Sequence, residues 1–232
     1  MRIRHKPYAY PELCSWPHFI KDPPALRGQW HALFGNDAPI VLELGCGKGA
    51  FASQYAAAHP DRNLIAVDIK NEILVLAKRK LEAQIAAGHI LPGQVYIMAQ
   101  DIMRISLMLA PEDRIAAIYI NFCNPWPKTP HKKRRLTHPK QLMQYRSFLN
   151  DGGEIRFKTD DDELFEESLE YFRQCGFDLA AASRDIHADG LPDGYLMTEH
   201  EEQFLEMGRT IKYAVARKQP DTVSPSRTAD CR

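Results

Sequence analysis

The chain has 232 residues, of which 44% are hydrophobic and 26% are charged, and these values are typical of a globular protein with one α/β domain. Its 30 basic and 30 acidic residues give a formal net charge of +0, so any affinity for nucleic acid must come from local patches. Five widely spaced cysteines without a C-x-x-C pair exclude a disulfide framework and indicate no metal site, which favours a cytoplasmic protein, and no apolar run is long enough to span a membrane.

Three segments follow one another along the chain. Residues 1–38 contain five prolines, and we expect an irregular basic arm with one short helix near Leu26–Phe34. Residues 39–217 alternate apolar runs with helical periodicity, which predicts strands at 39–44, 63–68, 94–99, 115–121, 154–159, 177–183 and 210–217, and helices at 49–59, 71–87, 139–150 and 162–175. Residues 218–232 are polar and are expected to form a disordered tail.

Alternation of strands and helices predicts a mostly parallel sheet with helices on both faces. Ligands of such sheets bind beyond the carboxyl ends of the strands. Each motif described below follows or ends a predicted strand, so we expect one shared site at that edge.

A glycine-rich turn joins the first predicted strand to the first helix. Gly45 and Gly47 allow a tight turn and let a ligand approach the backbone. The same turn fits the dinucleotide pattern G-x-G-x-x-A. Glu43 would repel a pyrophosphate there, whereas it could hold the cationic amino group of methionine, so the turn favours S-adenosylmethionine over a dinucleotide.

Acidic residues also end the second strand and follow the third. Asp68 could accept hydrogen bonds from both ribose hydroxyls of an adenosine. Asp101 could accept one from the adenine amino group, with Ile102 against the ring. Asp101 has no standard place in a dinucleotide site, which again favours S-adenosylmethionine as the cofactor.

A stiff, cationic loop follows the fourth strand. It reads NFCNPWPKTPHKKRRLT from Asn121 to Thr137, and its three prolines hold it extended. The rigid part could position a base near the methyl donor. The basic part could neutralise RNA phosphates, and the residues proposed for this are Lys132, Lys133, Arg134 and Arg135.

This loop resembles the signature N-F-x-D-P-W-P-K-x-x-H-x-K-R-R-L of the bacterial tRNA (guanine-N7-)-methyltransferase family. Two later segments are also similar to that family: F-K-T-D at 157–160 resembles its K-T-D, and T-E-H-E at 198–201 resembles its T-x-[YF]-E. The resemblance covers roughly residues 38–217, with the motifs in the family's order.

The resemblance implies a Rossmann-like class I methyltransferase with seven strands, one of them an antiparallel closing strand. It implies transfer of a methyl group from S-adenosyl-L-methionine to N7 of the variable-loop guanosine of tRNA (tRNA position 46), by a monomer or a homodimer. The implied cofactor residues are Glu43, Asp68, Asp101 and Asn124, and the implied tRNA-facing residues are Lys128, Asp160, Thr198, Glu199, His200 and Glu201.

Two residues depart from the family pattern. Asn124 replaces the aspartate of D-P-W, and His200 replaces the aromatic residue of T-x-[YF]-E. Guanine N7 carries a free lone pair and no proton, so its methylation needs no general base. We therefore expect Asn124 to orient the base and the cofactor, and Asp160 to hold the N1 and N2 hydrogens of guanine.

The sequence is also compatible with other functions. Asn124-Pro125-Trp126 distantly resembles the N-P-P-[YFW] loop of enzymes that methylate exocyclic amines. A non-catalytic RNA-binding protein would explain Asn124 but has no need for Glu43 and the other strand-end carboxylates. An NAD(P) oxidoreductase would leave the basic loop unexplained, and a tight turn that binds nothing would explain only the glycines.

Overall fold

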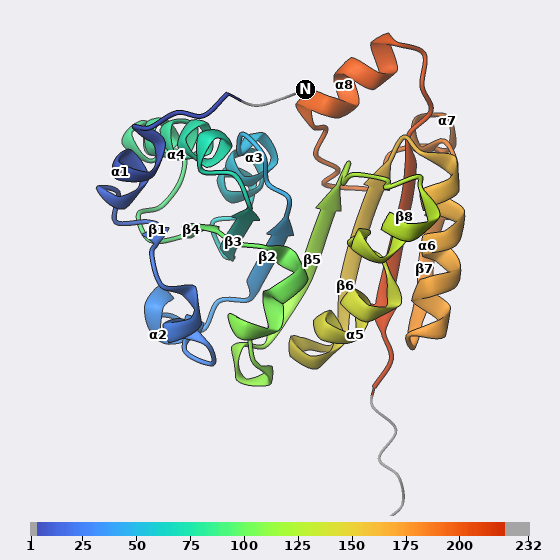
Figure 1. Ribbon diagram of the computed structural model, residues 1–232, viewed down its shortest axis with the longest axis horizontal. Coiled ribbons are helices and arrows are strands. Elements are labelled where there is room, and N and C mark those ends of the chain that lie inside the picture. The colour runs from blue at the N-terminus through green and yellow to red at the C-terminus, as the bar shows by residue number, and fades with distance from the viewer. Residues whose placement is uncertain (1–3, 221–232) are drawn as a thin grey trace, which may run out of the picture.

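The computed structural model describes residues 4–220, which form an eight-stranded sheet in the order β1-β4-β3-β2-β5-β6-β8-β7 (Figure 1). The strands are β1 (Phe19–Ile20), β2 (Ile40–Leu44), β3 (Asn63–Asp68), β4 (Val95–Ala99), β5 (Ile115–Asn121), β6 (Leu149–Thr159), β7 (Phe177–Ser183) and β8 (Lys212–Lys218). Strands β1 to β6 are parallel, and β8 runs antiparallel between β6 and β7. The mostly parallel sheet with an antiparallel closing strand is confirmed.

The helices lie on both faces of this sheet. They are α1 (Ala9–Cys14), α2 (Trp30–Phe34), α3 (Ala50–Ala58), α4 (Asn71–Ala86), α5 (Pro139–Phe148), α6 (Asp162–Gln174), α7 (Ile186–Asp189) and α8 (Glu199–Glu206). Short 3₁₀ segments are η1 (Pro23–Leu26), η2 (Ile102–Leu107), η3 (Pro111–Asp113) and η4 (Thr129–Arg134). Helices α3 and α4 pack on β3, while α5 and α6 pack on β6 from the other face.

Alternating side chains of β3 serve the two cores. Leu64 and Ala66 pack with α3 and α4, whereas Ile65 and Val67 belong to the core under α5 and α6. A strand buried on both faces has no polar alternation, which is why these strands appear as continuous apolar runs in the sequence. Because β2 to β6 run parallel to one another, their carboxyl ends meet at one edge of the sheet.

Glycine at position 49 permits the close crossing of α3 and α4. Gly49 has a φ of 74°, and a Cβ at this position would lie 2.7 Å from the Cβ of Ala77 on α4. Any side chain would therefore push α4 away from the turn that precedes α3. Gly49 therefore sets how closely the turn after β2 approaches α4, the helix that follows β3.

The expectation of an irregular amino-terminal arm is wrong for much of residues 4–38. Helix α1 packs against α4, where Arg79 donates to both carboxylate oxygens of Glu12 at 2.8 and 2.7 Å. Strand β1 pairs with β4 and adds an eighth strand to the seven expected. Proline content suggested an irregular arm, but buried aromatic residues such as Trp16, Phe19 and Trp30 anchor the segment on the domain.

The described residues end shortly after β8. The predicted tail was expected from residue 218, yet β8 continues through Lys218. Residues 1–3 of the predicted arm and 221–232 of the predicted tail lie outside the described residues. Within residues 4–220, no helix is both long enough and apolar enough to cross a membrane.

Candidate active site

The glycine turn lies where β2 ends. Gly45 and Gly47 adopt left-handed φ values of 86° and 53°, a conformation that glycine takes without steric penalty. The backbone N–H groups of Gly45 and Cys46 both donate to the carbonyl of Val67 on β3, each at 2.9 Å. A Cβ at Gly45 or Gly47 would meet nothing within 4 Å, because both residues border a cavity of about 100 Å³.

Glu43 lines this small cavity and is only 2% exposed. Its Oε2 has no hydrogen-bond partner among residues 4–220, and neither amide atom of the neighbouring lining residue Asn121 has one there. Burial, followed by the nearby charge of Asp68, raises the pKa of the Glu43 carboxyl to about 8, against a smaller opposing effect of the adjacent Asn121 amide. A buried carboxyl and amide without partners are costly, so this cavity is suited to a hydrogen-bonding cation.

A larger cleft of about 640 Å³ lies beside the small cavity. Gly45, Asn121 and Phe122 line both spaces, so one elongated ligand could occupy the two together. The further residues lining the large cleft are Asp68, Ile69, Asp101, Ile102, Met103, Cys123, Asn124, Trp126, Arg134 and Leu136. All seven positions predicted for the cofactor therefore border one of the two spaces.

The two strand-end aspartates are fixed by backbone donors. Gly47 N donates to Asp68 Oδ2 and Lys70 N to Oδ1, both at 3.0 Å. Met103 N donates to Asp101 Oδ1 at 3.0 Å at the start of η2. Each carboxylate oxygen can accept a second hydrogen bond, so both aspartates remain able to bind polar groups in the cleft.

The loop after β5 is held in an unusual backbone conformation. Phe122 and Trp126 have positive φ values of 53° and 45°, which is uncommon for residues other than glycine and costs on the order of 1–3 kcal/mol each. Trp126 N donates to Asn124 Oδ1 at 3.0 Å, closing a short turn. Strain of this kind clusters at functional sites, and here it directs Asn124 and Trp126 into the large cleft.

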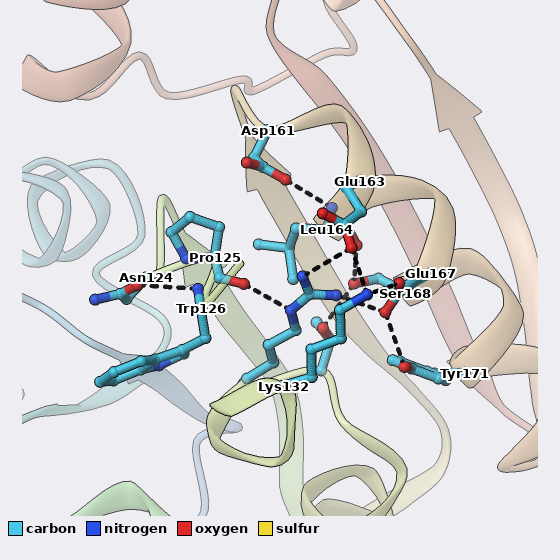
Figure 2. A network of polar contacts seen from close by, with 12 residues as sticks. Asn124, Pro125, Trp126, Lys132, Asp161, Glu163, Leu164, Glu167, Ser168 and Tyr171 are labelled. Atoms are coloured by element: carbon cyan, nitrogen blue, oxygen red, sulfur yellow. Dashed lines mark hydrogen bonds and ion pairs between the residues drawn. The ribbon is translucent and has the colours of Figure 1, made fainter. Parts of the chain in front are cut away.

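The basic run, from Lys132 to Arg135, divides into two pairs of residues with different surroundings. Lys133 and Arg134 are exposed, and the Arg134 guanidinium lies 5.1 Å from the centre of the Trp126 ring. Arg135 is fully buried and bonds to Glu167 at 2.6 Å, and Lys132 pairs with Glu163 and Glu167 on α6 (Figure 2). The expectation of a phosphate contact is thus wrong for Arg135, and Lys132 already has carboxylate partners.

The segment from Thr198 to Glu201 starts α8 with a capping box, in which Thr198 and Glu201 satisfy each other's backbone N–H groups. Thr198, Glu199 and His200 line the small cavity, and Glu199 pairs with Lys80 on α4 at 2.5 Å. Glu201 instead is fully buried. Glu201 is therefore too buried to contact tRNA directly, and the expectation is wrong for this residue.

Glu201 forms the centre of a buried network. Its carboxylate accepts from Lys158 on β6 at 2.9 Å, contacts His187 Nε2 at 2.9 Å and accepts from the Tyr195 hydroxyl. Burial opposes ionisation of Glu201, but Lys158, Tyr195 and His187 outweigh it and lower its pKa. The network fixes the start of α8 to the sheet and so positions the three residues that border the cavity.

Two residues predicted to face tRNA lie outside both spaces. Asp160 follows β6, is mostly buried and pairs with the half-exposed Arg209. Lys128 is exposed at the start of η4. The two residues after Asp160 start α6. Asp161 caps it by accepting from Leu164 N at 2.7 Å, and Asp162 is its first residue.

The cysteines near the site are poorly suited to nucleophilic chemistry. Burial raises the pKa of the Cys123 thiol to about 12 and also raises that of Cys46, so neither forms the reactive thiolate at neutral pH. Within the described part of the chain, no group of three or more His, Cys, Asp or Glu residues could hold a metal ion. The site therefore offers carboxylates, amides and aromatic rings as its working groups.

Sequence reasoning gave no role to Asn121, Phe122 or Lys158. Asn121 and Phe122 open the signature loop, so the motif itself could have indicated them. Phe122 stacks on His200 with ring centres 6.5 Å apart, which brings two segments about 80 residues apart together. Lys158 lies in the F-K-T-D segment, but a lysine near the end of a strand is usually solvated, so the motif did not indicate its buried contact with Glu201.

Comparisons with known proteins place the chain among methyltransferases. Residues 37–214 match the protein family described as "Putative methyltransferase". A tRNA (guanine-N(7)-)-methyltransferase from Clostridium perfringens (strain SM101 / Type A) is 52% identical over 219 residues, which cover 94% of this chain and 100% of that protein. One from Acetivibrio thermocellus is 50% identical over 218 residues, with 94% and 100% coverage.

Solved structures with the same fold are more distant in sequence. The 16S rRNA methyltransferase KamB matches with a TM-score of 0.61 at 14% identity, covering 83% of this chain and 93% of that one. An rRNA adenine methyltransferase from Catenulisporales acidiphilia, crystallised with its cosubstrate SAM, matches with a TM-score of 0.57 at 13% identity, covering 89% and 95%. At this identity the likeness supports the fold alone.

Proposed function

This chain belongs to the family of tRNA (guanine-N(7)-)-methyltransferases, and on that premise we propose that it methylates N7 of a guanosine in tRNA, with S-adenosylmethionine as the methyl donor. We further propose the variable-loop guanosine (tRNA position 46) as the target. The observation that carries the proposal is that Glu43 Oε2 and the Asn121 amide, all buried atoms, have no hydrogen-bond partner among residues 4–220 and border a small cavity that shares lining residues with the large cleft.

The residues present fit the cofactor. A cationic ammonium group would give the Glu43 carboxylate and the Asn121 amide oxygen the partner that they lack. Asp68, on the neighbouring strand, is placed to accept from ribose hydroxyls. Asp101 and Ile102 would receive the adenine at the far end of the large cleft.

The chemistry asks little of the protein beyond positioning. The bound cofactor supplies a methyl carbon made electrophilic by a sulfonium, and N7 of guanine supplies the lone pair. Alignment of the two can contribute on the order of 7–11 kcal/mol in favourable cases. The strained loop from Phe122 to Trp126 performs this task, because it holds Asn124 and the Trp126 ring in the cleft.

The RNA side of the site is built from exposed groups around the cleft. Lys133 and Arg134 on η4, with Lys128 at its start, are placed to neutralise phosphates. Glu199 and His200 border the small cavity from α8. Asp160 could hold the guanine N1 and N2 hydrogens only if Arg209 releases it.

The test is incubation of the protein with labelled S-adenosylmethionine and unmodified tRNA, followed by digestion and identification of the labelled nucleoside. We expect N7-methylguanosine, and no label when tRNA position 46 is changed to adenosine. A methylated exocyclic amine would instead favour an amino-methyltransferase. Absence of labelling together with tight tRNA binding would favour a non-catalytic RNA-binding protein.

We propose that this reaction takes place in the cytoplasm, in agreement with the cysteine pattern, and that the enzyme is a monomer or a homodimer. Light scattering during size-exclusion chromatography distinguishes the two states.

A further inference from the structure

One side of helix α6 faces the signature loop and carries a row of polar groups. Glu163, Glu167 and Tyr171 are spaced four residues apart, so they lie on one face of the helix. The Tyr171 hydroxyl donates to Glu167 Oε2 at 2.9 Å. Lys132 of the loop pairs with both glutamates, and Figure 2 shows these side chains gathered beside Asn124, Pro125 and Trp126.

Arg135 connects this row to the loop. Its Nη1 donates to Glu167 Oε2 at 2.6 Å, and its Nε donates to the carbonyl oxygen of Pro125 at 2.6 Å. The guanidinium is fully buried and the Glu167 side chain is mostly buried, so solvent weakens these bonds less than it would at the surface. Glu167, Arg135 and Pro125 therefore form a continuous chain of charge-assisted hydrogen bonds from α6 to the loop.

The end of this chain lies between the two residues that the loop presents to the cleft. Pro125 is flanked by Asn124 and by Trp126, whose φ of 45° is strained. Such conformations persist only where the surroundings hold them. The turn bond from Trp126 N to Asn124 Oδ1 at 3.0 Å acts within the loop, so it cannot by itself fix the loop to the body of the protein.

We propose that Glu167 is a positioning residue that acts through Arg135 to hold Asn124 and Trp126 in the cleft. Its effect on the rate of methyl transfer rests on the proposed function, whereas its effect on the loop does not. Glu167 lies 32 residues from Arg135 in sequence and touches neither of the two spaces described above. Arg135 is thereby a structural member of the basic run rather than an RNA ligand.

A role in helix packing alone is the competing explanation. Loop and helix also meet at the buried Thr137–Ser168 hydrogen bond of 2.6 Å, which would keep α6 in place without Glu167. If Glu167 served stability only, its removal would lower the melting temperature and leave the loop unchanged. Loop geometry therefore has to be measured separately from stability.

Trp126 provides that measurement. The chain has three tryptophans; Trp16 and Trp30 are buried, and Trp126 is partly exposed. Quenching of tryptophan fluorescence by acrylamide thus reports mainly on the loop. Glu167→Gln is compared with Glu166→Gln, a matched control on α6 that loses the exposed ion pair with Arg184 instead.

We expect Glu167→Gln to increase quenching and to lower kcat by roughly 10-fold to 100-fold, because small displacements of positioning groups have effects of this size. The dissociation constant for S-adenosylmethionine should change by a smaller factor than kcat, since Glu43, Asp68 and Asp101 are untouched and only Asn124 of the cofactor positions is displaced. Glu166→Gln should match the parent in all three measurements. Unchanged quenching with Glu167→Gln, or an equal effect of Glu166→Gln, would overturn the proposal.

Tyr171→Phe gives a milder second variant if Glu167→Gln does not fold. It removes one hydrogen bond that orients Glu167, and we expect the same changes at a smaller scale, roughly two- to five-fold in kcat. Unchanged quenching and kcat in Tyr171→Phe would then contradict the proposal. If the parent enzyme fails to methylate tRNA, the proposed function is lost, but the quenching comparison still decides the role of Glu167.

Discussion

At the scale of single residues, Asn124 is the position where this chain departs most from the family signature. Its Oδ1 accepts from Trp126 N, which an aspartate could do equally well. An aspartate would also leave a second oxygen, with its charge, near the positive charge that develops on guanine during transfer. Under the proposed function, asparagine would retain the geometric part of this role and lose the contribution of the charge.

Replacement of Asn124 separates these two parts. We expect Asn124→Ala to lower the single-turnover rate by roughly 10-fold to 100-fold, with little change in the dissociation constant for tRNA. Asn124→Asp should be as fast as the parent or faster, because it keeps the turn and adds a charge. Rapid-quench measurements test both variants, and an alanine variant as fast as the parent would remove Asn124 from the mechanism.

Residues at strand ends could be predicted from the sequence, and their partners could not. Glu43, Asp68 and Asp101 follow or end apolar runs, and parallel strands bring such ends together. Lys132 and Arg135 look the same in sequence as Lys133 and Arg134. Only the fold places two of these four against α6, about 30 residues further along the chain.

At the scale of secondary structure, continuous apolar runs and helical periodicity predicted the seven main strands and the four long helices. The exceptions are short elements. Strand β1 has two residues and α1 has six, so neither shows a periodic pattern. Their positions depend on contacts with β4 and α4, which local sequence does not encode.

The crossing of α3 and α4 yields a prediction at this scale. Gly49→Ala should lower the free energy of unfolding by about 1–3 kcal/mol, because the new Cβ meets Ala77 and the residue has a positive φ. Gly88→Ala, also at a positive φ but with nothing within 4 Å, is the matched control and shows the backbone effect alone. Urea denaturation compares the two, and equal losses would contradict the steric argument.

At the scale of the whole molecule, a chain with a net charge of +0 must bind RNA through a limited surface. Within the basic run, only Lys133 and Arg134 are exposed and can contact phosphates. Lys133→Ala should therefore lower the slope of log affinity for tRNA against log salt by about 0.7–0.9.

Lys132→Ala provides the matched comparison one residue away. Lys132 pairs with Glu163 and Glu167, so its loss should leave the salt slope unchanged even where it disturbs the loop. Filter binding over a range of KCl concentrations measures both variants. A larger slope change for Lys132 than for Lys133 would show that the division of the basic run is wrong.

Ligand binding in the proposed cofactor pocket should be coupled to the ionisation of Glu43. Burial and the charge of Asp68 raise the pKa of Glu43 to about 8, so the carboxyl is mostly protonated at pH 7.0 before a ligand binds. A cationic ammonium group beside it would lower that pKa again. Binding should then release a proton, and affinity should rise as the pH increases toward 8.

Calorimetry with S-adenosylhomocysteine, which carries the same ammonium group, tests this claim most directly. At pH 7.0, titrations in two buffers of different ionisation enthalpy should show release of close to one proton by the parent. Glu43→Gln should release none and bind more weakly, while Glu82→Gln, on α4 outside both spaces, should behave like the parent. Binding without proton release, or unaltered binding by Glu43→Gln, would contradict the assignment of this pocket to the methyl donor.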